Sequence, residues 1–353
     1  MDIHALMDIA FQKGAADMHL SVGRRPVLRL GGGLVEFGDA PLTAADTESL
    51  SKQICPLRNW EELQKVGTTD FGVAHGDKCR YRVSVLTQKG MRGLVMRQIP
   101  QKLLSFEQIG LPEHVQDLLK LHRGLVLVTG PTGSGKTTTL ATMIDWINRN
   151  RQAHIITIED PIEYYHTHRQ SQVTQREVGT DVPTFSEAMR RALRQDPDVI
   201  LLGEMRDLET TSAAITAAET GHLVFGTLHT TGAARTVDRV IDQYPKEQQE
   251  QIRSQLSLSL KAVVSQILMP AAGGGRCAGF EILLTNPAIE NHIRKAETFK
   301  IPSVMETSRR QGMVLMDVHL RELYQEGRIT KECAIEHAFD RKDMATRLSG
   351  GAV

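Results

Sequence analysis

One stretch of the sequence has the spacing of a phosphate-binding loop. Residues 130–137 read Gly-Pro-Thr-Gly-Ser-Gly-Lys-Thr, which matches the pattern G-x-x-x-x-G-K-[ST]. Glycines let backbone N–H groups converge on phosphate oxygens, and the helix that follows adds the partial positive charge of its N-terminus. Lys136 would supply charge to the β- and γ-phosphates, and the Thr137 hydroxyl would be a ligand for Mg²⁺. The predicted nucleotide-binding residues are Gly130, Thr132, Gly133, Ser134, Gly135, Lys136, Thr137 and Thr138.

Two carboxylates follow strand-like runs further along the chain. Glu163 comes after the run at residues 154–158, and Glu204 after the run at 199–202. Hydrolysis of a triphosphate needs one group that activates water and another that supports the metal. An ordinary Walker B strand ends in Asp, but Gly203 stands there, so we assign Glu204 to Mg²⁺ through water and Glu163 to water activation. The alternative is that both are helix caps or solvated loop residues.

Two histidines and two arginines are further candidates for contact with phosphate. His222 precedes and His229 follows the run at residues 223–228, and His229 stands at the carboxyl end, where a γ-phosphate would sit. Taken alone, a histidine is more often a core or surface residue. Arg82 and Arg97 could supply charge to the nucleotide of their own chain or of a neighbouring subunit, or they could form a solvated face.

The segments around the loop predict a parallel α/β sheet. Short Val/Ile/Leu-rich runs alternate with helical patterns, as strands buried on both faces require. The runs lie at residues 125–129, 154–158, 199–202 and 223–228. A capping box at residues 184–187 opens one of the intervening helices. In such a sheet the carboxyl ends of the strands hold the ligand, which is where the candidate loop and carboxylates lie.

The first hundred residues have a different pattern. Residues 79–85 alternate strictly, with Cys79, Tyr81 and Val83 on one side of a strand, and a second strand is predicted over residues 93–99. The sequence therefore predicts a small α+β domain over residues 1–100. A linker is expected at residues 101–112, followed by the larger α/β domain over residues 113–353.

Composition excludes several classes of protein. Among the 353 residues, 42 Lys and Arg balance 42 Asp and Glu, and only 5% are aromatic, which argues against nucleic acid as a partner. No apolar run approaches the roughly 18 residues of a spanning helix, and no signal peptide is recognisable at the start. The 4 cysteines form no C-x-x-C pair. We therefore expect a cytoplasmic protein that reaches a membrane only through partners.

Four motifs in order resemble those of the secretion ATPase superfamily, the GspE/PilT family. They correspond to its Walker A motif, Asp box, Walker B motif and His box, at residues 130–138, 158–164, 192–207 and 220–230. Residues 17–21 and 80–83 of the small domain agree as well. Within the superfamily, the similarity is to the retraction ATPases of type IV pili, and it covers nearly the whole chain.

This resemblance implies a PAS-like N-terminal domain, a RecA-like ATPase domain and a homohexameric ring that binds ATP and Mg²⁺. Glu163 would be the catalytic base and Glu204 would organise Mg²⁺. His222 and His229 would contact phosphate, and Arg82 and Arg97 would complete the site. The ring would work at the cytoplasmic face of the inner membrane, on the pilus platform protein.

Two features distinguish retraction from extension within this superfamily. Extension and secretion ATPases carry a four-cysteine metal module near residues 273–278, where this chain has only Cys277. Retraction ATPases carry the motif AIRNLIRE, which reads AIENHIRK at residues 288–295 here. The departure leaves an accessory retraction paralogue as an alternative. An extension or secretion ATPase and a DNA translocase are further alternatives.

Overall fold

The computed structural model describes residues 1–100 and 103–349, which form two compact units. The first unit comprises Met1–Leu103 together with Pro161–Tyr165. The second comprises Leu104–Asp160 and the described chain from His166 onward. The chain therefore passes between the units three times.

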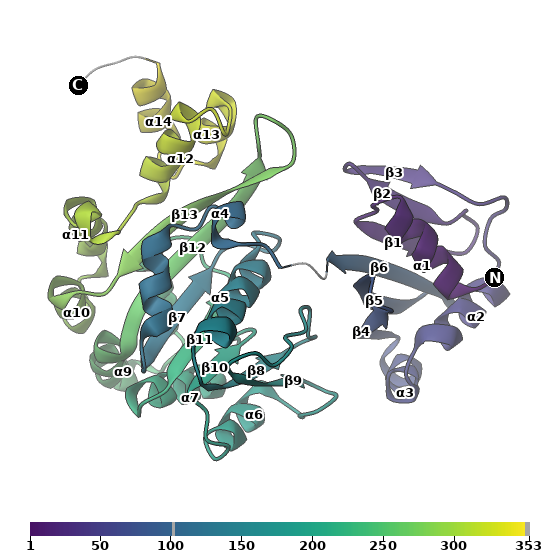
Figure 1. Cartoon of the computed structure of the whole chain (residues 1–353), viewed down its shortest axis with the longest axis horizontal. Coiled ribbons are helices and arrows are strands. Elements are labelled where there is room, and N and C mark those ends of the chain that lie inside the picture. The colour runs from purple at the N-terminus through teal and green to yellow at the C-terminus, as the bar shows by residue number, and fades with distance from the viewer. Residues whose placement is uncertain (101–102, 350–353) are drawn as a thin grey trace. The chain divides into compact units, whose positions relative to one another are not determined.

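The first unit is built on a six-stranded antiparallel sheet with the order β3-β2-β1-β6-β5-β4 (Figure 1). Its strands are β1 (Asp17–Leu20), β2 (Val27–Leu30), β3 (Gly33–Glu36), β4 (Thr68–His75), β5 (Cys79–Gln88) and β6 (Met91–Pro100). Its helices are α1 (Ile3–Gln12), α2 (Ala44–Ile54) and α3 (Leu57–Val66). Apolar residues of these helices, such as Ile3, Leu50 and Leu63, pack with Tyr81 and Val83 of the sheet to form one core.

The second unit contains a seven-stranded sheet with the order β13-β12-β7-β11-β10-β8-β9. The strands are β7 (Gly124–Thr129), β8 (His154–Glu159), β9 (Gln172–Glu177), β10 (Val199–Leu202), β11 (Leu223–Leu228), β12 (Leu260–Pro270) and β13 (Arg276–Leu284). All neighbours are parallel except β12 and β13. Every residue of β7, β10 and β11 is buried, as their largely apolar sequences predict.

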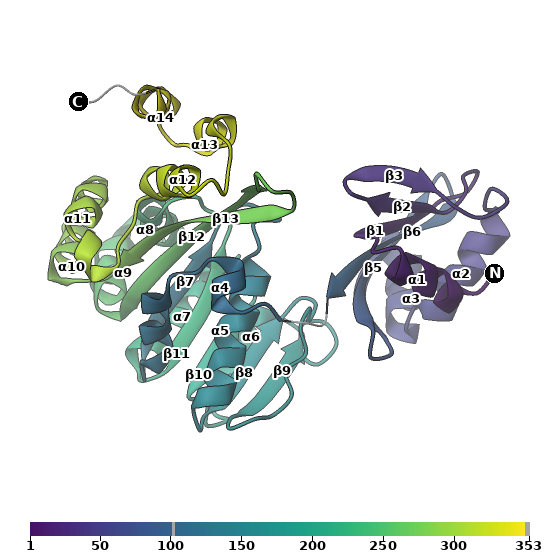
Figure 2. The ribbon, with the colours of Figure 1, turned by 45° about the horizontal axis from the view of Figure 1, so that its top comes forward.

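Helices cover both faces of this sheet (Figure 2). On one face lie α4 (Phe106–Ile109), the 3₁₀ segment Glu113–Lys120 and α5 (Lys136–Asn150), and on the other α6 (Phe185–Ala192), α7 (Leu208–Glu219), α8 (Ala233–Ile241) and α9 (Lys246–Ser259). The chain continues through α10 (Pro287–Arg294), α11 (Ile301–Thr307), α12 (Met316–Gln325), α13 (Lys331–His337) and α14 (Arg341–Leu348). The predicted parallel sheet with flanking helices is therefore confirmed.

The predicted linker is partly wrong. Residues 101–102 lie outside the described residues, but the chain from Leu104 belongs to the second unit. Ser105 caps α4 through a capping box with Gln108, and Phe106 and Ile109 are buried in the core beside α5. A capped helix with buried apolar side chains is part of a domain rather than of a linker. In the sequence, the Ser-x-x-Gln pattern indicates the start of this helix.

Candidate functional site

The phosphate-binding loop joins the carboxyl end of β7 to the start of α5. Gly130 and Gly135 have φ angles of 144° and 90°, in the region that favours glycine. A Cβ atom on Gly130 would collide with the backbone carbonyl of Gln266, and one on Gly135 would lie 2.9 Å from the Gln266 side-chain nitrogen. Glycine at these two positions therefore permits both the backbone conformation of the loop and its close approach to β12.

Polar groups of the loop are arranged for a ligand. Lys136 Nζ donates to the carbonyls of Gly130 and Pro131, at 2.7 and 3.1 Å. Burial lowers the pKa of Lys136, while the charge of Glu204 acts in the opposite direction. Ser134 Oγ is buried and has no hydrogen-bond partner among the described residues. A buried hydroxyl without a partner and a lysine folded against its own loop fit a site that takes phosphate oxygens.

Gly203 brings β10 close to β8 at the same edge of the sheet. Its N–H donates to the carbonyl of Ile158 at 2.8 Å, and its carbonyl accepts from Thr227 Oγ1 at 2.5 Å. A Cβ atom at this position would lie 3.2 Å from the Ile158 oxygen. The close packing of these strands therefore disfavours a side chain at Gly203.

Glu204 and His229 come together at this edge. The Glu204 carboxylate contacts Arg206 Nε at 2.6 Å and His229 Nε2 at 3.1 Å. Burial opposes ionisation of Glu204, but the hydrogen bond and charge of Arg206, with the contribution of His229, outweigh it and lower the pKa of the carboxyl. Glu204 is thus a carboxylate at neutral pH, as the predicted role near a metal requires.

The residues present fit Mg²⁺ bound together with a nucleotide. In the described part of the chain, no group of three or more His, Cys, Asp or Glu side chains could hold a metal ion. Mg²⁺ is commonly bound by one or two protein ligands together with substrate phosphates and water. The Thr137 hydroxyl, at the start of α5, would be the protein ligand, and the ionised Glu204 would act on the metal through water.

The structure does not support the predicted phosphate contact of His222. This residue stands at the amino end of β11, beside Gly124, and its Nδ1 lies 3.0 Å from the carbonyl of Ala217. The phosphate loop begins after the opposite end of β7, about 20 Å away at the rise of a strand. His222 therefore cannot reach a phosphate held by the loop of its own chain, because phosphates bind at the carboxyl ends of the strands.

Three predicted residues belong to the first unit instead. Arg82 and Arg97 lie directly opposite each other on β5 and β6, and both are exposed. Arg97 Nε also donates to Asp17 Oδ1 at 2.8 Å. Glu163 is half-buried within Pro161–Tyr165, the segment that the contacts assign to this unit.

Gln266 is a site residue that the sequence did not identify. It is buried on β12, its Oε1 accepts from Thr139 Oγ1 at 2.7 Å, and it lies against both Gly130 and Gly135. Its only signal was a pair of polar residues, Ser265 and Gln266, inside an apolar strand. Arg206 was also missed as a partner of Glu204.

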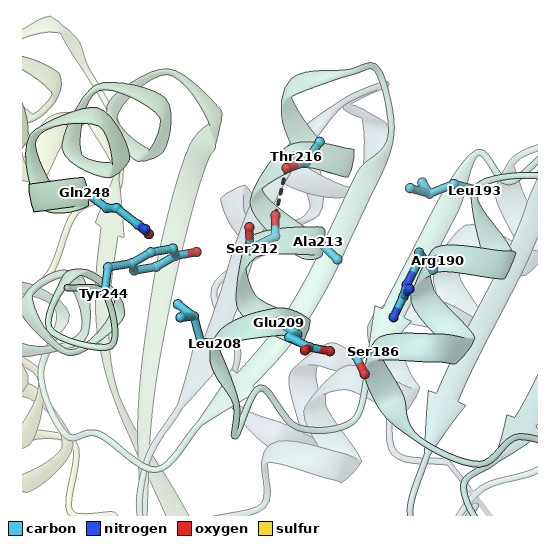
Figure 3. A pocket seen from close by; sticks show the side chains of 10 residues that line it. All are labelled: Ser186, Arg190, Leu193, Leu208, Glu209, Ser212, Ala213, Thr216, Tyr244 and Gln248. Atoms are coloured by element: carbon cyan, nitrogen blue, oxygen red, sulfur yellow. Dashed lines mark hydrogen bonds between the residues drawn. The ribbon is translucent and has the colours of Figure 1, made fainter.

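A separate pocket of about 580 Å³ lies away from the loop (Figure 3). Tyr244 and Gln248 form one side, α7 residues from Leu208 to Thr216 form the floor, and Arg190 of α6 faces them across it. None of the predicted site residues lines this pocket. The candidate site is therefore the phosphate loop and the strand ends around it.

Comparison with known proteins agrees with this fold. The family described as Type II/IV secretion system protein matches residues 67–348. The type IV pilus retraction ATPase PilT of Pseudomonas aeruginosa is 46% identical over 338 residues, covering 96% of this chain and 98% of that protein. The type IV pilus ATPase PilU of the same organism is 37% identical over 353 residues, covering 100% of this chain and 92% of that protein.

A solved structure shares the fold over nearly the same length. The crystal structure of the pilus retraction motor PilT with bound ADP superposes with a TM-score of 0.90 at 44% identity. It covers 97% of this chain and 98% of that chain. The chain therefore belongs to the type II/IV secretion system protein family, as a P-loop ATPase.

Proposed function

We propose that the protein is the ATP-hydrolysing motor that retracts type IV pili. The observation that supports this most strongly is the match to a retraction ATPase along almost the full length of both chains. The phosphate loop with Lys136, and the ionised Glu204 beside it, supply the chemistry that such a motor needs.

In the proposed mechanism each residue has one task. The loop N–H groups and Lys136 bind the phosphates, and Thr137 with Glu204 would hold Mg²⁺, which neutralises phosphate charge when bound. Glu163 accepts the proton of the attacking water, and His229 contacts the γ-phosphate. Arg82 and Arg97 stabilise the charge that develops on the phosphoryl group.

The proposed assembly is a homohexamer at the cytoplasmic face of the inner membrane, acting on the pilus platform protein. This part rests on the resemblance to retraction motors. No helix in the described ranges is long and apolar enough to cross a membrane. We expect no role for nucleic acid.

Deletion of the gene tests the direction of the motor. A strain without the protein should carry more surface pili than its parent and should fail to twitch. A strain without pili would indicate an extension motor and would contradict the proposal. Stimulation of the ATPase by DNA, with a steep salt dependence, would instead support a translocase.

An accessory retraction paralogue is the second candidate, because α10 departs from the retraction motif. Glu290 lies 3.9 Å from Arg294, and His292 Nδ1 lies 3.1 Å from Glu297, so these substituted side chains have partners within the chain. The main motor should support twitching when it is the only retraction ATPase in the cell. An accessory protein should fail in that strain.

A further inference from the structure

The segment that carries Glu163 is attached to the first unit by its contacts. β8 ends at Glu159 in the second unit, yet Pro161–Tyr165 groups with the first unit, and the chain returns at His166. Within the segment Ile162 is buried and Tyr165 is 60% exposed. The contacts that hold this segment on the first unit therefore also determine the position of Glu163.

Arg80 is the residue beneath Tyr165. It lies on β5, between Ala74 of β4 and Ile99 of β6, and its side chain is buried although it is charged. The centre of its guanidinium group lies 3.9 Å from the centroid of the Tyr165 ring. Its Nε has no hydrogen-bond partner among the described residues. The face of the Tyr165 ring is thus one stabilising contact for this buried cation.

Gly72 makes room for that arrangement. A Cβ atom on Gly72 would collide with the Arg80 guanidinium and would lie 3.7 Å from the backbone oxygen of Ile162. Gly72 does not have a positive φ, so the backbone itself does not require glycine. The missing side chain instead lets the guanidinium lie across β4, directly below the segment.

We propose that Tyr165 is a positioning residue for the water-activating Glu163. Its stack on Arg80 fastens Pro161–Tyr165 to the first unit, so that Glu163 moves with that unit during the ATPase cycle. This inference rests on the proposed role of Glu163 as the base. Tyr165 contacts no reacting atom and acts only through the position of the segment.

The matched pair Tyr165→Ala and Tyr165→Phe tests the stack. Phenylalanine keeps the aromatic face and loses only the hydroxyl, whereas alanine removes the ring. We expect the alanine variant to lose about tenfold in kcat, with the Kd for ATP changed by less than about twofold, because the loop is untouched. The phenylalanine variant should retain the kcat of the parent. Because Tyr165 is exposed, both variants should fold, and unchanged melting temperatures would verify this.

Gly72→Ala tests the same stack by disturbing Arg80 instead of Tyr165. The added methyl group should displace the Arg80 guanidinium and lower kcat to a similar extent. If both substitutions act through one contact, the double variant Gly72→Ala/Tyr165→Ala should be no slower than either single variant. Hydrogen exchange at the backbone amides of residues 162–165 should rise in the alanine variants and stay unchanged in Tyr165→Phe.

The outcomes separate this inference from the proposed function. A normal kcat in Tyr165→Ala, or an equal loss in Tyr165→Phe, would overturn the positioning role. Normal hydrolysis by Glu163→Gln would instead remove the proposed base, and with it the catalytic consequence of the stack. Faster hydrogen exchange in Tyr165→Ala would still show that the stack holds the segment.

Discussion

At the scale of single residues, two polar side chains of the phosphate loop are available to bind phosphate oxygens. Lys136 Nζ donates to two carbonyls of its own loop, and Ser134 Oγ is buried without a partner in the described ranges. Phosphate oxygens would replace the carbonyls as acceptors and satisfy the hydroxyl. The loop therefore gains charge-assisted hydrogen bonds when nucleotide binds.

Replacement of Lys136 by alanine should weaken ATP binding. Loss of the charge-assisted bonds costs about 1.5–3 kcal/mol, which corresponds to roughly 10- to 150-fold in Kd. Equilibrium titration with a fluorescent ATP analogue measures this change. Lys120→Ala is the control, because Lys120 is exposed and pairs with Asp117 on the surface. An unchanged Kd in Lys136→Ala would contradict the assigned role.

Glu163→Gln should separate binding from turnover. Glutamine cannot accept the proton of the attacking water, so kcat should fall by at least about 100-fold. The Kd for ATP should stay close to that of the parent, because the phosphate loop is intact. Turnover and binding are measured on the same preparation, and a variant that hydrolyses ATP normally would refute the assignment.

Gly203 should not tolerate the Asp that usually ends a Walker B strand. A side chain there meets the Ile158 oxygen and the Glu159 backbone. We expect Gly203→Asp to destabilise the protein by about 1–3 kcal/mol and to lower kcat by displacing Glu204. Gly203→Ala, with its single methyl group, should cost less. Urea unfolding of both variants tests this order, and equal stability of Gly203→Asp and the parent would disprove it.

At the scale of elements, Glu281 of β13 joins the starts of two helices. Its Oε1 accepts from the N–H of Ala233 at the start of α8, and its Oε2 from that of Met316 at the start of α12. The residue is 6% exposed, so both amides would lack an acceptor without it. Glu281 therefore connects the helix that follows His229 to the C-terminal helices.

Glu281→Ala should destabilise the protein by about 2–5 kcal/mol, because two buried N–H groups lose their acceptor. Glu281→Gln should cost roughly half of that, because it keeps one acceptor oxygen. Urea unfolding midpoints measure both. An equal loss of unfolding free energy in Glu281→Ala and Glu281→Gln would argue that Glu281 does not serve as the acceptor for both helix starts.

The same residue predicts a dependence on pH. Burial raises the pKa of Glu281 above its ordinary value of 4.5, although the two backbone hydrogen bonds act to lower it. A carboxyl with a raised pKa contributes stability that is present below pH 4.5 and is lost as the pH rises through the raised value. The cost of Glu281→Gln should therefore shrink as the pH rises over this range. A cost that grows with pH would contradict the direction of the shift.

At the scale of the whole molecule, the two units share the residues assigned to catalysis. Lys136 and Glu204 lie in the second unit, whereas Arg82, Arg97 and the Glu163 segment lie in the first. The arginines could act on the nucleotide of their own chain or on that of a neighbouring subunit.

Mixed assemblies can distinguish these two arrangements. Arg82→Ala/Arg97→Ala subunits lack the arginines, and Lys136→Ala subunits lack the phosphate lysine. If the arginines act on the nucleotide of their own chain, every subunit of a mixed assembly lacks either the arginines or Lys136. The ATPase activity of the mixture should then equal the sum of the activities of the two variants measured separately. Recovery of activity on mixing would show that a neighbouring subunit supplies the arginines.

Local patterns made much of this protein predictable. The strand, the Gly130–Thr137 loop and α5 are consecutive in the chain, and apolar runs marked the buried strands. The structure places His222 and His229 at opposite ends of β11, although they are close in the sequence. A strand separates its two ends by its full length.

The nucleotide loop, the parallel sheet and the carboxyl edge that carries the candidate site could be predicted from the sequence, because each depends on neighbours along the chain. Long-range packing sets the contact of Gln266 of β12 with the loop and the contact of Glu204 with His229. It also sets the stacking of Tyr165 on Arg80. These contacts join residues that are far apart in the chain, and their geometry is set by how the strands and helices pack rather than by any local pattern.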